Sequence, residues 1–261
     1  MRLLTPSVPG GVAYSVFLPP SYARGGGPYP VLYFLHDAFG SDRVLWRHGV
    51  ISALDAAMRD GSLPEFLVVC PDGDGSWFSN SHDGRRLYEN FVADDLPREV
   101  ASRFRVLPEP RGRAITGISM GGYGAMKIAL RHPGNYGAVS GLSAALLALD
   151  WDSVELLSGL ARRQIHHVFG NSPTDNSFAE NDVWRLLAAK DKWDVPFEVF
   201  LLGGADDKYG LGGTGAQYVD FLNRRGIRAT ARIEPGIHDW PYWRKAMLEI
   251  ARWHGAQFAA R

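Results

Sequence analysis

The feature that most constrains the fold is an alternation of short apolar runs with segments of helical periodicity. The apolar runs predict β-strands at residues 14–18, 31–35, 66–70, 114–117, 138–141, 197–202 and 229–234. Several of these runs are apolar almost without interruption, which is typical of strands covered on both faces. Helix-type segments between the strands favour crossover connections and a mostly parallel sheet. The sequence therefore predicts an α/β fold with helices on both faces of a central sheet.

Apolar residues recur at helical spacing between these runs. The sets that would share one helix face are Ile51, Leu54 and Met58; Leu96, Val100 and Phe104; Tyr218, Phe221 and Leu222; and Met247, Ile250 and Phe258. A chain of 261 residues suits one sizeable domain, so we expect a single domain over residues 1–261. Residues 146–194 interrupt the alternation. We expect them to form an excursion over the carboxyl edge of the sheet, where the active sites of such folds lie.

Charge and composition exclude several classes of function. The 28 basic side chains balance the 28 acidic ones, so neither nucleic acid nor a membrane surface is expected as a partner. No apolar run is long enough to span a bilayer, and the N-terminus lacks the pattern of a signal peptide, which favours the cytoplasm. The single cysteine, Cys70, ends an apolar run, and a small buried side chain is a better interpretation than a catalytic thiol.

A serine stands in the pattern G-x-S-x-G, formed by Gly117, Ser119 and Gly121. The pattern alone is weak in a chain with 30 glycines, and a glycine-rich turn before a packed helix would look the same. The neighbouring sequence favours a catalytic serine over a simple turn, because a strand-type run precedes the pattern and a helix-type segment follows it. A sharp strand-to-helix turn lifts the serine hydroxyl clear of the sheet. We predict Ser119 as a nucleophile and the N–H of Met120 as a donor to the oxyanion.

A nucleophilic serine needs a histidine that takes its proton and a carboxylate that orients the histidine. In α/β-hydrolases the chain order is Ser, then Asp or Glu, then His. Of the eight histidines, His238 follows the predicted strand 229–234 and precedes a helix, which would place it at the carboxyl edge. The strand 197–202 leads into Asp206 and Asp207, and spacing alone leaves both open as the acid.

A second donor to the oxyanion is expected after an early strand. The run 31–35 leads into His36, Asp37 and Ala38, and we predict the N–H of Ala38 as this donor, with the other two as scaffold. A metal site at His36 and Asp37 lacks further ligands at suitable spacing, so no metal or other cofactor is expected. Candidates for a substrate pocket, or equally for packing, are Trp77, Phe78, Trp151, Trp184 and Trp193.

Together these motifs resemble the family of α/β-hydrolases that includes esterase D, tributyrin esterases and feruloyl esterases. The resemblance covers nearly the whole chain and rests on residues 14–22, 30–36, 71–73, 88–91, 117–125 and 236–240, with Trp46 and Trp243. It implies an α/β-hydrolase fold and a serine carboxylic-ester hydrolase with a Ser–Asp–His triad and an acyl-enzyme. The implied substrates are small-molecule esters with short acyl, acetyl or feruloyl groups.

The resemblance also bears on which aspartate is the acid of the triad and on the acyl group that the enzyme prefers. The family pattern Gly-x-x-Asp matches residues 204–207 and favours Asp207, although residues 203–206 match as well. The family commonly has His-Gly where this chain has His36 and Asp37, which bears on the preferred acyl group. A mycolyltransferase-type acyltransferase or a siderophore-lactone esterase would use the same triad. A binding protein without catalysis would be expected to lack one of the three residue types. The oligomeric state is left open.

Overall fold

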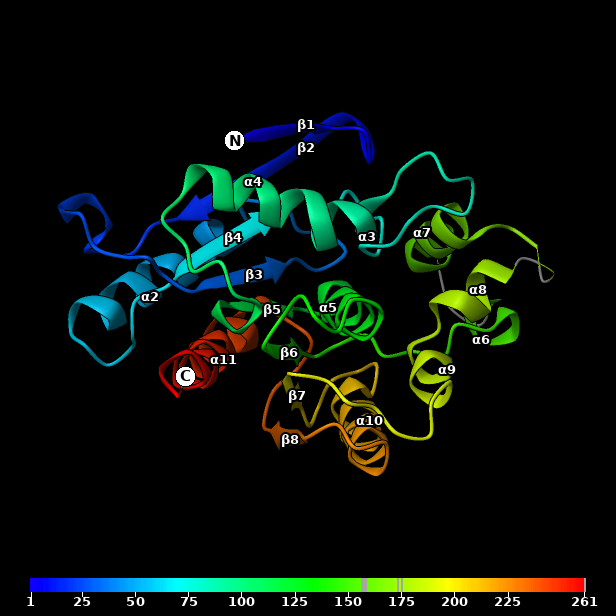
Figure 1. Ribbon diagram of the computed structural model, residues 1–261. Coiled ribbons are helices and arrows are strands. Elements are labelled where there is room, and N and C mark those ends of the chain that lie inside the picture. Colours follow the sequence, from blue (N-terminus) through cyan, green and yellow to red (C-terminus); the bar gives the residue numbers. More distant parts are fainter. Residues whose placement is uncertain (156–158, 173, 175, 261) are drawn as a thin grey trace.

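The computed structural model describes residues 1–155, 159–172, 174 and 176–260, and in this part of the chain eight strands form one sheet (Figure 1). The strands are β1 (Arg2–Thr5), β2 (Val8–Phe17), β3 (Val31–Leu35), β4 (Leu67–Pro71), β5 (Arg113–Gly117), β6 (Ala138–Leu142), β7 (Glu198–Gly204) and β8 (Ala229–Glu234). Their order is β1-β2-β4-β3-β5-β6-β7-β8, and pairing is parallel from β4 through β8. The predicted mostly parallel sheet is confirmed, with β1 and β2 added antiparallel at one edge.

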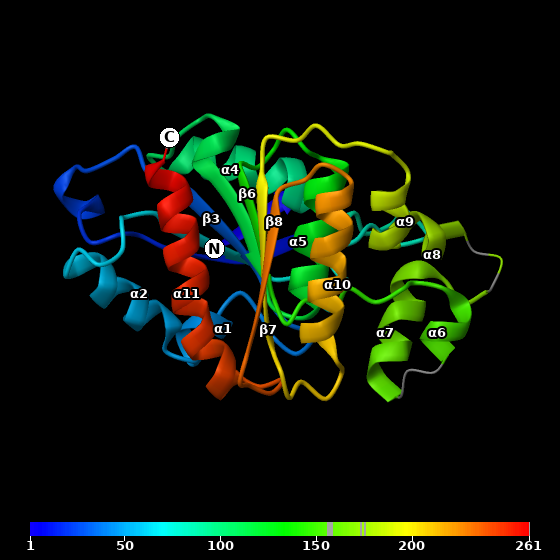
Figure 2. The ribbon, with the colours of Figure 1, turned by 90° about the horizontal axis from the view of Figure 1, so that it is seen from below.

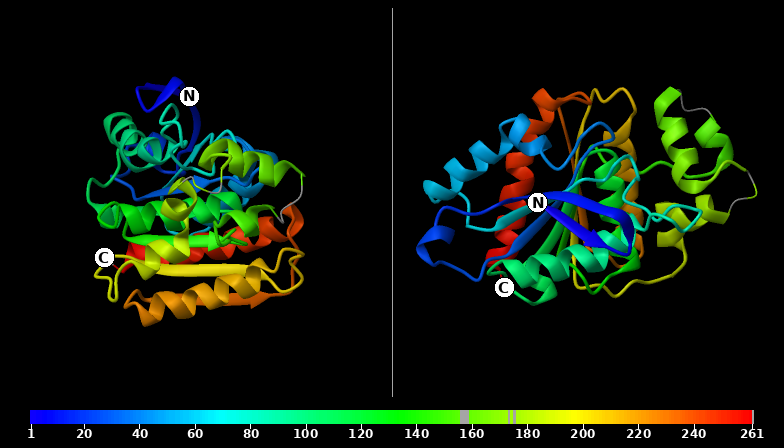
Figure 3. Two further views of the ribbon diagram at one scale, coloured as in Figure 1. Left: turned by 90° about the vertical axis from the view of Figure 1, so that its right-hand side faces the viewer. Right: turned by 90° about the horizontal axis from the view of Figure 1, so that it is seen from above.

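Helices cover both faces of the sheet. They are α1 (Val44–Arg47), α2 (Val50–Arg59), α3 (Tyr88–Asn90), α4 (Leu96–Arg103), α5 (Met120–Arg131), α6 (Trp151–Glu155), α7 (Gly159–Phe169), α8 (Asn176–Asn181), α9 (Val183–Ala188), α10 (Leu211–Arg224) and α11 (Trp240–Ala259). Figure 2 shows α2 and α11 on one side of the sheet and α5 and α10 on the other. The left view of Figure 3 shows the N-terminal strand and α10 at opposite ends of the molecule. Among the described helices, none is both long and apolar enough to cross a membrane.

The strand β3 shows why the apolar runs are uninterrupted. Val31, Tyr33 and Leu35 pack into the core on the side of α4, α5 and α10. Leu32 and Phe34 pack into the second core, with α2 and α11. Successive side chains of a strand point to opposite faces, and here both faces are covered, so every position has to be apolar.

Most predicted strands lie within two residues of the observed ones; the larger difference is at the N-terminal edge of the sheet, and a further one is at the end of α4. The first predicted strand is only the end of β2, which has ten residues, and the short β1 that pairs with it was not predicted. The residues of β1 alternate between exposed and half-buried, so they carry no strong apolar signal. Phe104 lies just beyond α4 in extended backbone, so the predicted helix face ends at Val100.

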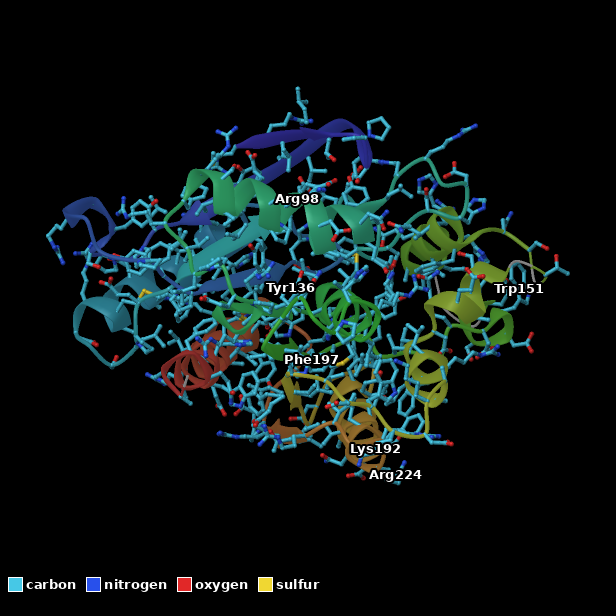
Figure 4. All side chains as sticks on the ribbon, viewed as in Figure 1. Arg98, Tyr136, Trp151, Lys192, Phe197 and Arg224 are labelled. Atoms are coloured by element: carbon cyan, nitrogen blue, oxygen red, sulfur yellow. The ribbon has the colours of Figure 1, made fainter. Side chains whose placement is uncertain are left out.

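Residues between β6 and β7 form the helices α6–α9. Figure 2 shows them beside α5 and α10, on the side away from α11. The ring of Trp151 (Figure 4) packs edge-on against Phe178, with the two ring centroids 5.9 Å apart. The ring of Trp184 packs in the same way against Tyr218, with a centroid distance of 4.8 Å. These two tryptophans therefore pack the excursion and its border with α10. The organisation of residues 1–261 as one domain, with the excursion over the active-site edge, stays a prediction.

A buried cluster of charges joins α5 to α3 and α8. The Lys127 ammonium is fully buried, lies 2.9 Å from a Glu89 carboxylate oxygen and donates to Asn181 Oδ1 at 3.1 Å. Arg131 and His132 face the same carboxylate at 3.1 and 3.2 Å. Burial lowers the pKa of Lys127 to about 8, although Glu89 opposes the shift. Burial acts to raise the pKa of Glu89, but Lys127, His132 and Arg131 outweigh it and hold that pKa well below its usual range.

Replacing Glu89 by glutamine is expected to lower the free energy of unfolding by about 3–5 kcal/mol, because Lys127 would stay buried without a counter-charge. Urea unfolding at pH 7 measures this. Since the pKa of Glu89 is lowered by folding, its stabilisation is present above the ordinary carboxyl pKa of about 4.3 and is lost progressively as the pH falls below it.

Two further variants control this prediction. The double variant Glu89→Gln, Lys127→Met buries neither charge and is expected to recover part of the loss. Arg59→Gln breaks the exposed pair of Arg59 and Asp55, and is expected to leave the free energy of unfolding nearly unchanged, because solvent screens such a pair. A loss for Glu89→Gln no larger than that of Arg59→Gln would show that the cluster does not stabilise the fold.

Candidate active site

Ser119 occupies the sharp turn between β5 and α5. Its φ of 53° and ψ of −115° are unusual for a residue with a side chain, and such strain is held only when the surroundings determine it. The Ser119 N–H donates to the Leu142 carbonyl at 3.0 Å, and the Ser119 carbonyl accepts from the Ala145 N–H at 3.0 Å. The end of β6 therefore holds the turn through hydrogen bonds on both sides.

The flanking glycines allow this turn by their lack of a side chain. A Cβ atom on Gly121 would lie 2.0 Å from the Leu35 carbonyl oxygen, and one on Gly117 would lie 2.3 Å from the backbone of Gly121. These are backbone atoms that cannot move aside. Any side chain would therefore push the first turn of α5 away from β3 and β5, and the spacing G-x-S-x-G has a steric cause.

Three of the predicted side chains form a hydrogen-bonded chain. His238 Nδ1 lies 2.7 Å from Asp207 Oδ2, and His238 Nε2 lies 3.1 Å from Ser119 Oγ. A carboxylate can only accept, so Nδ1 carries the proton and donates to Asp207. Nε2 is then free to accept from the serine hydroxyl. This is the arrangement in which a histidine can take the proton of a nucleophilic serine.

The two candidate acids occupy different surroundings. The Asp207 side chain is fully buried, and its second oxygen accepts from the Tyr209 N–H at 2.9 Å. Asp206 is exposed, and its N–H donates to the Gly236 carbonyl at 3.0 Å, which joins the loop of the acid to the loop of His238. Asp207 thus lies against His238, whereas the Asp206 side chain faces solvent.

Two aromatic rings flank His238, and no sequence pattern predicts a role for either of them. The Tyr209 ring lies 5.0 Å from the imidazole at 86°, and the Trp243 ring lies 4.7 Å from it at 84°. Tyr209 is 58% exposed, whereas Trp243 is 4% exposed. Trp243 was part of the sequence motif after His238, so its spacing was a signal. Nothing in the sequence marked Tyr209.

The loop after β3 is held by His36. Its Nδ1 donates to the Asp37 carbonyl at 2.7 Å, and its Nε2 accepts from the Gly73 N–H at 2.7 Å. The two bonds require a neutral imidazole with the proton on Nδ1. His36 therefore joins the loop after β3 to the loop after β4. The Asp37 carboxylate is buried, and within the described residues its Oδ1 has no hydrogen-bond partner.

The two predicted oxyanion donors stand on neighbouring segments. Met120 is the first residue of α5, so its N–H has no acceptor within the helix. Leu35 pairs with Gly117, and the Ile118 N–H donates to the Leu35 carbonyl at 3.1 Å, which sets the loop after β3 beside the start of α5. Ala38 lies half-buried in that loop. The helix N-terminus adds positive potential where an anion would form.

Comparison with models of known families shows to which family the chain belongs. The model of the family described as "Putative esterase" matches residues 6–254. The chain belongs to this esterase family. The resemblance drawn from the sequence motifs is confirmed.

Curated relatives and solved structures of esterases agree with this assignment. An esterase of Mycobacterium tuberculosis is 29% identical over 214 residues, which are 78% of this chain and 45% of the relative. The chain thus spans less than half the length of that relative. The acetyl esterase of Caldicellulosiruptor saccharolyticus is 24% identical over 235 residues, 85% of this chain and 82% of the relative. A solved ferulic acid esterase superposes with a TM-score of 0.81 at 25% identity, over 99% of this chain and 97% of its own. The predicted α/β-hydrolase fold is confirmed.

Proposed function

We propose that this chain is a serine carboxylic-ester hydrolase with Ser119, His238 and Asp207 as its catalytic triad. The observation that carries the proposal is the hydrogen-bonded chain from Ser119 Oγ through the imidazole to the buried Asp207 carboxylate. Membership of the esterase family supports the same reaction class. Each of the three side chains follows a different strand at the carboxyl edge, where α/β folds build their sites.

The proposed reaction proceeds through an acyl-enzyme. Ser119 Oγ attacks the ester carbonyl carbon while His238 Nε2 takes the hydroxyl proton. The N–H groups of Met120 and Ala38 stabilise the negative oxygen of the tetrahedral intermediate. The intermediate then collapses, and His238 gives its proton to the leaving alcohol.

A water molecule completes the cycle. It gives a proton to His238 Nε2 and attacks the acyl-enzyme carbonyl, and collapse of the second tetrahedral intermediate returns the proton to Ser119 and releases the acid. Asp207 holds the imidazole in the required tautomer and stabilises the imidazolium that forms in each half of the reaction. This chemistry requires no metal or other cofactor.

For the substrate we propose small-molecule esters of short-chain acyl, acetyl or feruloyl groups. The acetyl esterase among the relatives and the ferulic acid esterase among the solved structures support this range. A short acyl group would bind beside the oxyanion donors, where Asp37 stands in place of the glycine common in the family. The Asp37 side chain adds a carboxymethyl group where glycine has only a hydrogen atom, and we propose that this group narrows the space available to an acyl chain.

A labelling experiment tests the proposal. A fluorophosphonate probe is expected to form one adduct, and peptide mass spectrometry is expected to place it on Ser119. A series of p-nitrophenyl esters from acetyl to octanoyl, with a feruloyl ester beside it, is expected to show turnover that is highest for the short acyl groups or the feruloyl group. An adduct on another residue, or no turnover of any ester in the series, would contradict the proposal.

Transfer of the acyl group to an alcohol would use the same acyl-enzyme. We propose water as the acceptor. Product analysis in the presence of a competing sugar alcohol is expected to show mainly the free acid. If the transfer product dominated at low alcohol concentration, the chain would be an acyltransferase.

A further inference from the structure

We propose that Ser143 and Trp243 form a strut that sets the position of His238 relative to Ser119. The inference rests on the function proposed above and adds two positioning residues to it. Neither side chain takes part in the proton transfers or in the bonds that form and break. Both act through the residues that do.

One end of the strut lies in the segment that follows β6. Leu142 and Ala145 hold the Ser119 backbone, because the first accepts from its N–H and the second donates to its carbonyl, each at 3.0 Å. Between them, the Ser143 N–H donates to the Leu202 carbonyl of β7 at 2.8 Å. Since β7 leads directly to Asp207, the segment 142–145 is fastened both to the nucleophile and to the strand that carries the acid.

The Ser143 side chain extends this segment toward α11. Its φ of 45° is unusual for a residue other than glycine, and the side chain is 1% exposed. Its Oγ accepts the indole N–H of Trp243 at 3.2 Å, across 100 residues of chain. A buried indole N–H needs an acceptor, so this bond fixes both the depth and the rotation of the Trp243 ring.

The Trp243 ring is the other end of the strut and lies against the base. Its centroid is 4.7 Å from that of the His238 imidazole, and the two planes are nearly perpendicular. Both nitrogens of His238 are engaged, one by Asp207 and the other by Ser119. Packing against Trp243 therefore limits tilting of the imidazole about the axis that these two hydrogen bonds leave free.

The strut matters for rate because proton transfer from Ser119 Oγ to His238 Nε2 depends on their separation and alignment. A displacement of about 1 Å at reacting atoms can cost about 100-fold in rate. A change of this kind is expected to lower kcat and to leave KM nearly unchanged, because Trp243 and Ser143 are only 4% and 1% exposed and so present little surface to a substrate. A residue with a merely structural role would change the melting temperature without that pattern.

The test uses variants at both ends of the strut in the full chain. Trp243→Phe keeps a ring beside His238 but removes the N–H, and Ser143→Gly removes the acceptor while allowing the φ of 45°. Each is expected to lower kcat and the rate of fluorophosphonate labelling about 10-fold, with KM within about twofold of wild type. The double variant is expected to be no slower than the slower single variant, because both changes break one bond.

Trp253→Phe is the matched control, because Trp253 lies on the same helix and packs against Phe200, with a centroid distance of 5.5 Å, and not against the site. It is expected to keep wild-type kcat and labelling. The proposal is overturned if Trp243→Phe and Ser143→Gly keep wild-type kcat, or if their effects on kcat multiply in the double variant. Wild-type protein that is labelled on another residue would instead overturn the proposed function, so the two failures are distinguishable.

Discussion

Replacement of Ser119 by alanine is expected to reduce ester turnover by about 10⁶-fold, because removal of the nucleophile of a triad removes the covalent pathway as a whole. Alanine has the same backbone preferences as serine at the unusual φ of this turn, so the substitution removes the hydroxyl and leaves the strain in place. Initial rates with p-nitrophenyl acetate, at enzyme concentrations high enough to detect the residual rate, measure the effect.

Two controls separate loss of chemistry from loss of fold. Ser119→Ala is expected to keep the circular dichroism spectrum and the melting temperature of the wild type within a few degrees. His238→Ala combined with Ser119→Ala is expected to be no slower than either single variant, because triad members act as one unit. Turnover by Ser119→Ala within tenfold of wild type would exclude Ser119 as the nucleophile.

Asp207→Asn is expected to lower kcat by about 10⁴-fold, because an asparagine side chain can donate to Nδ1 and thereby favour the wrong tautomer of His238. Asp206→Asn offers a matched control on the neighbouring residue. The Asp206 side chain is exposed, and the carboxylate hydrogen-bonded to the imidazole is that of Asp207, so this variant is expected to keep kcat within about twofold. Steady-state kinetics of both variants on one ester provide the comparison.

The pair of variants also decides between the two acids that the sequence motif left open. Equal losses for the two variants would show that the loop rearranges as a unit and that neither aspartate has a distinct role. A larger loss for Asp206→Asn would assign the acid to the exposed residue and contradict the geometry at His238.

The sheet was predictable from the sequence because its central strands are covered on both faces. The apolar runs of β3 and β4 predict strands, and their predicted boundaries lie within one residue of the observed ones. The short β1 escaped prediction because its residues are half-exposed and pair with β2 alone. A strand that is buried on two faces has a continuous apolar sequence, whereas a short strand at an exposed edge has no such pattern.

The candidate site was predictable where chain order and local pattern coincide. Ser119 lies in a local motif, and the order Ser, Asp, His removed most of the eight histidines. Asp206 and Asp207 are adjacent, so only the direction of each side chain distinguishes them. The contact between Ser143 and Trp243 joins segments 100 residues apart, and no local pattern in one sequence carries such information.

The backbone of Ser119 also has a consequence for how this molecule can evolve. Its φ of 53° would suit glycine better, and strain of this kind costs about 1–3 kcal/mol. Selection for stability alone would therefore replace the residue on which the proposed reaction depends. Stability and activity oppose each other at this position, and stability-directed engineering of the chain should leave residue 119 out of its targets.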